Sequence, residues 1–231
     1  MLRYLICAHL ALLVLTRIAT AEDKPESLFN GKDLSGWEGN PTIWSVEEEA
    51  IVGRVTADRP LKNNTFLIWT GGVLDDFRLR LEYRIEGGNS GVQYRSTVLD
   101  PKEFIVGGYQ ADIDSETVYT GILYDERGRG ILAKRGERVK IDRNGKSEVT
   151  SFADAAELQK AVHTDGWNKY VIEARGPRLR HKINGKLMSE TFDRDREKRV
   201  ASGVLALQVH QGPPMTVRFR NIRLERLKDA E

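Results

Sequence analysis

The sequence predicts an all-β protein in which two antiparallel sheets pack together beside one short helix. Apolar and charged residues alternate with a period of two along the chain, most clearly over 77–86, where every odd position is apolar. Glycine turns separate many short stretches of this kind, and only one segment favours a helix. Short strands joined by frequent turns are typical of a sandwich of two sheets.

Four further stretches are predicted to be strands, and they run over 170–175, 179–183, 203–210 and 215–224. Asn184-Gly185 predicts a two-residue hairpin turn after 179–183, because both residue types tolerate positive φ. The last two stretches flank Gly212-Pro213-Pro214 and are expected to form a closing strand pair. The helix is expected over Asp154 to Val162, with Ser151 as its cap.

The first 21 residues have the features of a secretory signal peptide. Arg3 precedes an apolar run from Tyr4 to Leu15, and Ala19-Thr20-Ala21 is a small-residue cleavage site. The apolar run is short for a membrane span, and a retained amphipathic anchor is the alternative. We therefore expect cleavage after residue 21, a secreted or periplasmic protein without a membrane span, and a single domain over 22–231.

Charge and cysteine content exclude several classes of function. The whole chain holds 36 Lys and Arg against 34 Asp and Glu, and Arg3 and Arg17 in the signal segment account for the excess. The exported chain is then formally neutral, which gives no indication of a nucleic-acid partner. Cys7 is the only cysteine and leaves with the signal, so disulfides, thiol nucleophiles and cysteine-bound metals are not expected.

The segment from 87 to 96 is the first candidate binding region. The glycines of Gly87-Gly88-Asn89-Ser90-Gly91 allow a ligand to approach the backbone, and Asn89 and Ser90 offer hydrogen-bond groups. A tight β-connection is the alternative. If Val92 and Tyr94 share the apolar face, Gln93 and Arg95 share the other face, although Arg95 could also be a solvated surface residue.

The segment from 98 to 142 is rich in glycine and charge, and it predicts strands with long loops, where sandwiches often carry their functional residues. Gln110, Asp112 and Asp114 lie at period two and could hold sugar hydroxyls, bind a metal, or supply an acid or base. Protection of an exposed strand edge is the alternative. Tyr124 and Glu126 are expected to point the same way, before a turn with Arg127 and Arg129 that could simply be solvated.

The strand near the end of the chain has one apolar and one polar face. Leu205, Leu207 and Val209 mark the core side, whereas Ala206, Gln208 and His210 share the other side. The small Ala206 beside two polar residues indicates a surface with room for a ligand. His163 at the helix end and His181 in a basic strand are weaker candidates than His210. No G-x-S-x-G, H-E-x-x-H, phosphate-loop or dinucleotide motif is present.

A series of motifs spread over the chain resembles one known family. They are Leu28-Phe29-Asn30-Gly31-Lys32-Asp33-Leu34-Ser35-Gly36-Trp37, Asn89-Ser90-Gly91-Val92-Gln93-Tyr94-Arg95-Ser96, Thr120-Gly121-Ile122-Leu123-Tyr124, Gly166-Trp167-Asn168, Leu207-Gln208-Val209-His210 and Phe219-Arg220-Asn221-Ile222-Arg223-Leu224. The chain is similar over 28–227 to the 3-keto-disaccharide hydrolase domain family. The resemblance implies a concanavalin-type jelly-roll sandwich. It also implies a secreted enzyme that cleaves 3-keto-glycosides, as a hydrolase or as a lyase plus hydratase, by elimination next to the ketone.

This chemistry assigns roles to the candidate residues. His210 suits the base, Arg95 or a metal suits the ketone oxygen, and Glu126 or Tyr124 suits the acid. The residues expected to bind the carbohydrate substrate are Asn89, Ser90, Gln93, Gln110, Asp112, Arg127 and Gln208. No cofactor is certain, and a divalent metal is possible.

Two other functions stay open from the sequence. A carbohydrate-binding module of the same fold would lack catalysis, and a scaffold within a larger assembly would lack a site. Binding modules usually expose aromatic rings, whereas Trp37, Trp44, Trp69 and Trp167 lie in contexts that predict the core. The tryptophans therefore favour the enzyme.

Overall fold

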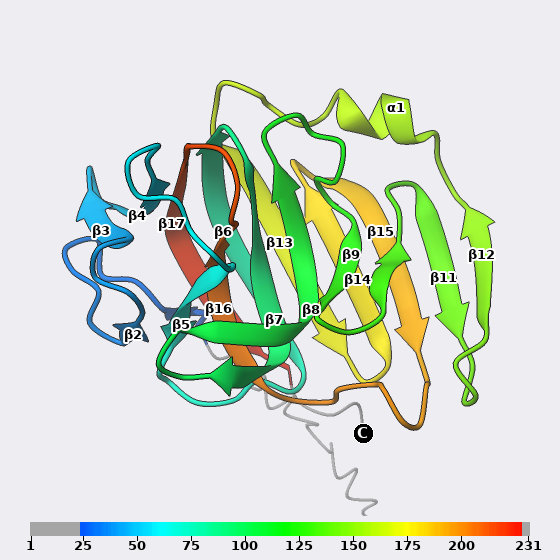
Figure 1. Cartoon of the computed structure of the whole chain (residues 1–231). Helices are drawn as coiled ribbons and strands as arrows, with labels where there is room; N and C mark the ends of the chain where they lie inside the picture. The colour runs from blue at the N-terminus through cyan, green and yellow to red at the C-terminus, as the bar shows by residue number, and fades with distance from the viewer. Residues whose placement is uncertain (1–23, 228–231) are drawn as a thin grey trace, which may run out of the picture.

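The computed structural model describes residues 24–227 as two facing β-sheets (Figure 1). The ten-stranded sheet has the order β12 (Ser147–Ser151), β11 (Glu137–Ile141), β15 (Lys186–Asp193), β14 (Arg178–Ile183), β13 (Asn168–Arg175), β6 (Phe77–Glu86), β17 (Met215–Arg226), β4 (Ala50–Val55) and β3 (Trp44–Glu47), and β1 (Glu26–Ser27) pairs with β17. The seven-stranded sheet has the order β10 (Gly130–Ala133), β9 (Leu123–Glu126), β8 (Ile105–Asp114), β7 (Asn89–Asp100), β16 (Val204–Val209), β5 (Thr65–Trp69) and β2 (Trp37–Glu38). The predicted sandwich is confirmed, and β11 with β15 is the parallel exception among the described pairs.

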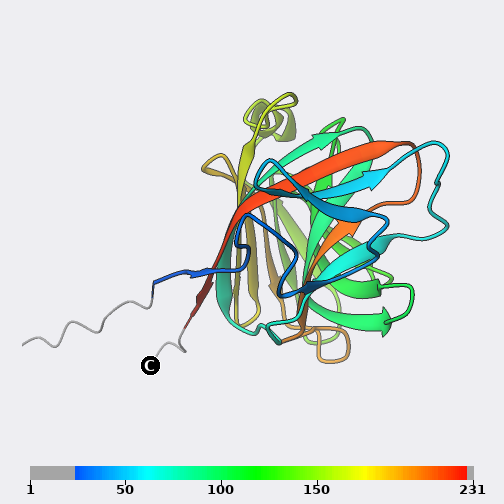
Figure 2. The ribbon, with the colours of Figure 1, turned by 90° about the vertical axis from the view of Figure 1, so that its left-hand side faces the viewer.

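The core lies between the facing sides of the two sheets (Figure 2). In β6 the apolar residues are buried and alternate with half-exposed charged ones, as the sequence predicts. Leu205, Leu207 and Val209 of β16 are buried in the core as well. Each large apolar side chain buried in this way contributes about 1.5–3 kcal/mol. The alternation therefore fixes which face of each strand turns inward.

The tryptophans follow the prediction with one correction. Trp37, Trp44 and Trp69 are buried in the core. Trp167 is only half-buried, and the guanidinium of Arg220 lies 3.9 Å from its ring centroid. Arg220 covers one face of this ring from the outer side of the ten-stranded sheet, and that face is not free to stack on a ligand.

The predicted hairpin turn is confirmed, whereas the predicted pairing of the last two strands is wrong. Asn184 (φ +48°) and Gly185 (φ +81°) do form the expected turn between β14 and β15. However, β16 pairs with β5 and β7, whereas β17 pairs with β4 and β6 in the other sheet. The connection through 210–214 therefore crosses from one sheet to the other. Apolar alternation shows which face of a strand is buried and carries no information about its partner.

The helix is shorter than predicted and has a different cap. α1 covers Ala155–Gln159, and the Asp154 carboxylate accepts a hydrogen bond from the Glu157 N–H (2.9 Å). Ser151 belongs to β12 instead. Asp154 is the N-cap because it lies directly before the first helical turn, where its side-chain oxygen reaches the free N–H of Glu157. Within residues 24–227, no helix is long and apolar enough to cross a membrane.

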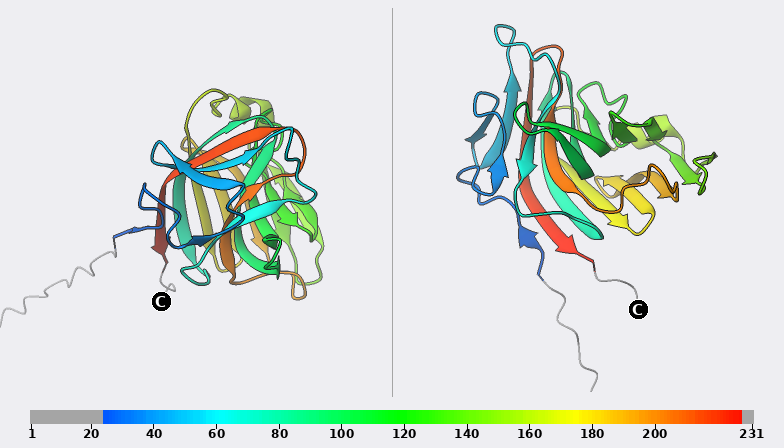
Figure 3. Two further views of the ribbon diagram at one scale, coloured as in Figure 1. Left: turned by 60° about the vertical axis from the view of Figure 1, so that its left-hand side comes forward. Right: turned by 60° about the horizontal axis from the view of Figure 1, so that its bottom comes forward.

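The hairpin between β7 and β8 bends over the outer face of the seven-stranded sheet (Figures 1 and 3). Its tip returns to β5, where the Phe66 N–H donates to the Phe104 carbonyl (3.0 Å). Val106 packs there with Phe66 and Ala206 in a small apolar cluster separate from the main core. This arm covers one part of the outer face and leaves the polar part beside it.

Candidate functional site

Polar side chains gather on the outer face of the seven-stranded sheet, away from the core. We call this group the polar face, and it consists of Gln93, Gln110, Asp112, Tyr124, Glu126 and Gln208. Cross-strand pairing places them in adjacent rows: one row runs through Gln208, Gly91 and Asp112, and the next through Ala206, Gln93, Gln110 and Tyr124. The strand pairing agrees with the prediction that Gln110 shares a face with Asp112 and that Tyr124 shares a face with Glu126.

Three glutamine amides form the floor of the polar face. Gln93, Gln110 and Gln208 are at most 2% exposed. The amides of Gln93 and Gln110 hydrogen-bond to each other (2.9 Å), and the Gln110 side chain lies over Gly91, where a Cβ would approach it to 2.6 Å. Both amide atoms of Gln208 are buried and have no hydrogen-bond partner in the part of the chain that the structure describes. An unpaired buried amide is costly, so this position favours an added polar partner such as water or a sugar hydroxyl.

Asp112 is the acidic group of this floor. Its side chain is buried and accepts hydrogen bonds from Asn89 Nδ2 (3.1 Å) and the Ile113 N–H (3.0 Å). Burial raises the pKa of Asp112 from 3.8 to about 7, although these hydrogen bonds act in the opposite direction. The carboxyl group can therefore hold or release a proton near neutral pH, which is what acid–base chemistry requires.

Replacing Asp112 by asparagine is expected to stabilise the protein by ~2–4 kcal/mol at about pH 8 and to change little at about pH 4. The folded-state pKa of Asp112 lies above its unfolded value. Folding therefore favours the protonated form, and this contribution is lost as the pH rises from about 4 to about 7. Asparagine keeps the accepting oxygen without the charge. Urea unfolding at both pH values measures the difference.

The exposed Asp165 provides the matched control, because Asp165→Asn should alter the free energy of unfolding by about 0.5 kcal/mol or less at either pH. An equal effect of Asp112→Asn at both pH values would contradict a buried carboxyl group with a raised pKa.

Glu126 connects the polar face to the loop that carries His210. Asn64 Nδ2 donates to Glu126 Oε1 (3.0 Å), and Asn64 Oδ1 accepts from the Gln211 N–H (3.0 Å). His210 comes directly after β16 and is half-buried, and its Nδ1 lies 2.5 Å from the Gln211 carbonyl. Sequence reasoning missed Asn64, because it precedes a strand and no local pattern distinguishes it.

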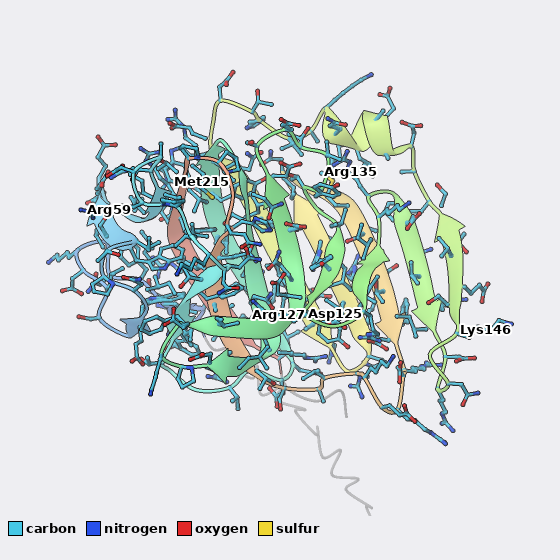
Figure 4. All side chains as sticks on the ribbon, viewed as in Figure 1. Arg59, Asp125, Arg127, Arg135, Lys146 and Met215 are labelled. Carbon is cyan, nitrogen blue, oxygen red and sulfur yellow. The ribbon has the colours of Figure 1, made fainter. Side chains whose placement is uncertain are left out.

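Tyr124 and Arg127 differ in their relation to the polar face. Tyr124 is half-buried opposite Gln110, and burial raises the pKa of its phenol. Arg127 is exposed in the turn after β9 and has positive φ (+56°); Figure 4 shows it at the end of that strand. Arg127 therefore borders the site, whereas Tyr124 lies within it.

The prediction that Arg95 shares a face with Gln93 was wrong. Arg95 has positive φ (+47°) at a bulge in the β7–β8 pairing, which turns its side chain away from the polar face. The side chain is 1% exposed and donates to the Asp75 carbonyl (2.7 Å), the Gly176 carbonyl (2.7 Å) and Asp76 Oδ1 (2.8 Å). Arg95 thus ties the β5–β6 connection, which joins the two sheets, to the β13–β14 turn and lies away from the polar face.

Ser90, which the sequence predicts to bind the substrate, does not lie on the polar face. It is fully buried, pairs with Val209 and Ile113 in a core-facing row, and donates from Oγ to the Gln208 carbonyl (2.6 Å). Asn89 remains on the polar side through its hydrogen bond to Asp112. The alternation that puts Asn89 outward puts Ser90 inward, since neighbouring residues in a strand face opposite sides.

The possible metal has no protein ligand set among residues 24–227. No group of three or more His, Cys, Asp or Glu side chains there is arranged to hold a metal ion. The polar face itself combines three amides with the carboxyl groups of Asp112 and Glu126 and the phenol of Tyr124, a composition suited to hydrogen bonding of hydroxyl groups.

Two facing sheets with a polar outer face define a jelly-roll sandwich of the concanavalin type. Among solved structures, a Parabacteroides distasonis protein described as a "putative glycosyl hydrolase" is similar, with 23% identity and a TM-score of 0.57 over 93% of this chain and 99% of that chain. The carbohydrate-binding module CBM66 of Bacillus subtilis has 19% identity and a TM-score of 0.53, over 82% and 95%. A Bacillus licheniformis β-glucanase has 7% identity and a TM-score of 0.51, over 89% and 99%. These likenesses establish the fold.

The family follows from the sequence. A family model described as a 3-keto-alpha-glucoside-1,2-lyase-like domain matches residues 24–225. The chain belongs to this family, which confirms the resemblance carried by its motifs. A search of the curated proteins found no match.

Proposed function

We propose that this protein cleaves glycosides whose sugar carries a ketone at carbon 3. Family membership supports the substrate class. The observation that carries the proposal is the composition of the polar face, where Asp112, Tyr124 and Glu126 lie among buried amides, and Asn64 links Glu126 to the loop that holds His210. Amides suit the recognition of sugar hydroxyls, and the surrounding groups suit proton transfer.

The reaction begins with an elimination. A base removes the proton on carbon 2, which the neighbouring ketone makes acidic, and the electron pair forms a double bond between carbons 1 and 2. The bond from carbon 1 to the leaving oxygen breaks, and that oxygen takes up a proton from an acid. Water then adds across the new double bond in a second step. Release before hydration makes the protein a lyase, and release after it makes the net reaction a hydrolysis.

The polar face, together with His210 in the adjoining loop, offers a group for each role. We assign His210 as the base and Glu126 or Tyr124 as the acid for the leaving oxygen. Because the Arg95 side chain is buried away from the polar face, the ketone oxygen needs a different donor. Asp112 suits this role, because a buried carboxyl group with a pKa of about 7 is partly protonated near neutral pH, and its protonated form can donate a hydrogen bond to a developing oxyanion.

Export is part of the proposal. The signal segment 1–21 lies outside the described residues, and its features in the sequence support a periplasmic or secreted protein. An exported enzyme would meet oxidised glycosides outside the cytoplasm.

Product analysis of the purified protein tests this function. Incubation with 3-keto-glycosides is expected to release the aglycone together with either the unsaturated sugar or the free 3-keto sugar, as identified by mass spectrometry. Parallel samples with a chelator report whether a divalent ion takes part. Binding without release, measured by calorimetry, would identify the carbohydrate-binding alternative. If the protein neither binds nor cleaves 3-keto-glycosides, the proposal is refuted.

A further inference from the structure

Among residues 24–227, strand β12 has no partner strand on one side of its backbone. It is the outermost strand of the ten-stranded sheet, at the right-hand margin of Figure 1, and all five of its residues are exposed. The Phe152 N–H donates to the Gly136 carbonyl (2.8 Å), and the Asp142 N–H donates to the Lys146 carbonyl (2.9 Å). In an antiparallel ladder this spacing directs even-numbered residues of β12 toward β11. The N–H and C=O groups of Ser147, Val149 and Ser151 therefore point outward.

The other sheet margins offer less for pairing. β2 has two residues, and β10 has four with a register shift between Ile131 and Ala133. β3 has four residues, and its Glu47 is paired with Arg54. β12 instead has an unbroken register, with neither proline nor lysine in the strand. Short edges, bulges and charges are the usual protections against edge pairing, and β12 has fewer of them.

Exposed apolar side chains gather at the same margin. Val149 of β12 is 56% exposed. Val118, Tyr119 and Ile131 are also exposed, and they line a cavity of about 510 Å³ together with Ser151. Lys146 stands at the outer end of this margin in Figure 4. Apolar surface beside an unpaired edge is typical of an interaction site.

We propose that two copies of this chain pair antiparallel through β12, about a two-fold axis at Val149. In this register Val149 exchanges both backbone hydrogen bonds with its equivalent, and Ser147 does so with Ser151 of the other copy. All of these groups already point outward, so each chain keeps its β11–β12 ladder. The result is one continuous sheet across both copies.

The side chains tolerate this register. Glu148 faces Thr150 of the other copy, so no like charges stand directly opposite each other. Lys140 lies beside Glu148 in the same chain and offsets its charge. The two Val149 side chains meet on the core-facing side, where each is now exposed. The edge is therefore complementary to itself, which favours a second copy over an unrelated partner.

Sedimentation velocity with Val149→Pro tests the pairing. The wild-type chain is expected to show a dimer in the micromolar range, and Val149→Pro is expected to stay monomeric at every such concentration. Proline removes an outward N–H and leaves the bonds to β11 intact, so the fold should persist. Val149→Thr keeps the N–H and is the matched control, expected to dimerise. A monomeric wild-type chain, or a dimer in Val149→Pro, would overturn the proposal.

Hydrogen exchange provides a test that needs no variant. On dilution from dimer to monomer, the amides of Ser147, Val149 and Ser151 should exchange faster. The amides of Glu148 and Thr150, which bond to β11, should keep their rates. Equal acceleration of odd and even amides would indicate fraying of the strand and would contradict the pairing.

Discussion

Replacing Arg95 by methionine is expected to lower the free energy of unfolding by about 3–5 kcal/mol, the usual effect of removing one partner of a buried ion pair. Arg95 is 1% exposed, and its guanidinium donates to Asp76 Oδ1 and to the Asp75 and Gly176 carbonyls. Methionine retains much of the volume and none of these hydrogen bonds. The Asp76 carboxylate and the Asp75 and Gly176 carbonyls would then lose the hydrogen bonds that the Arg95 guanidinium donates to them. Urea unfolding monitored by circular dichroism measures the change.

The exposed Arg127 supplies the control for this experiment. Arg127→Met should change the free energy of unfolding by about 0.5 kcal/mol or less. Any loss of activity in Arg95→Met should follow the folded fraction, since Arg95 lies away from the polar face. Normal stability combined with a large loss of rate per folded molecule would instead return Arg95 to the reaction.

Arg95 also shows where reading the sequence fails. Alternation predicts Gln93 and Arg95 on one face, and it holds for Val92 and Tyr94 in the core. The bulge at Arg95 breaks the alternation, and a bulge depends on the partner strand as much as on the bulged residue. Asn64 escaped detection for a related reason, because its contact with Glu126 spans 62 residues of sequence.

Alternation could have placed His181 correctly. Leu179 and Ile183 are buried and His181 lies between them at period two, whereas the basic residues around it point outward. His181 is 1% exposed, its Nε2 lies 3.0 Å from Tyr94 Oη, and its Nδ1 lies 3.1 Å from the Ile122 carbonyl. Burial lowers the pKa of His181 to about 4, so it is a neutral core residue. The charge of its basic neighbours makes the strand resemble an exposed one, whereas the period of two places His181 on the buried side.

The polar face was predictable because it needs only the strand period. Ala206 and Gln208 were expected opposite the aliphatic residues of β16, and the structure puts Gln208 in a row with Asp112 across Gly91. Which groups are buried enough to matter was not predictable. The raised pKa of Asp112 comes from burial, which depends on segments far apart in the sequence, such as the one with Asn89 and the one with Gly121 and Ile122.

His210→Ala is expected to reduce the rate of cleavage of a 3-keto-glycoside by about 10²–10⁴-fold, because the proposed reaction loses its base. Stability should change little, since His210 is half-buried and outside the core. Product release under saturating substrate measures the rate, and the thermal unfolding midpoint checks the fold. His163→Ala is the matched control, because His163 is exposed near α1 and its Nδ1 contacts only the Trp167 carbonyl among the contacts described for its ring. If His210→Ala folds normally and retains the full rate, His210 is not the base. If it unfolds instead, its role is structural, and the proton on carbon 2 must be removed by another group of the polar face.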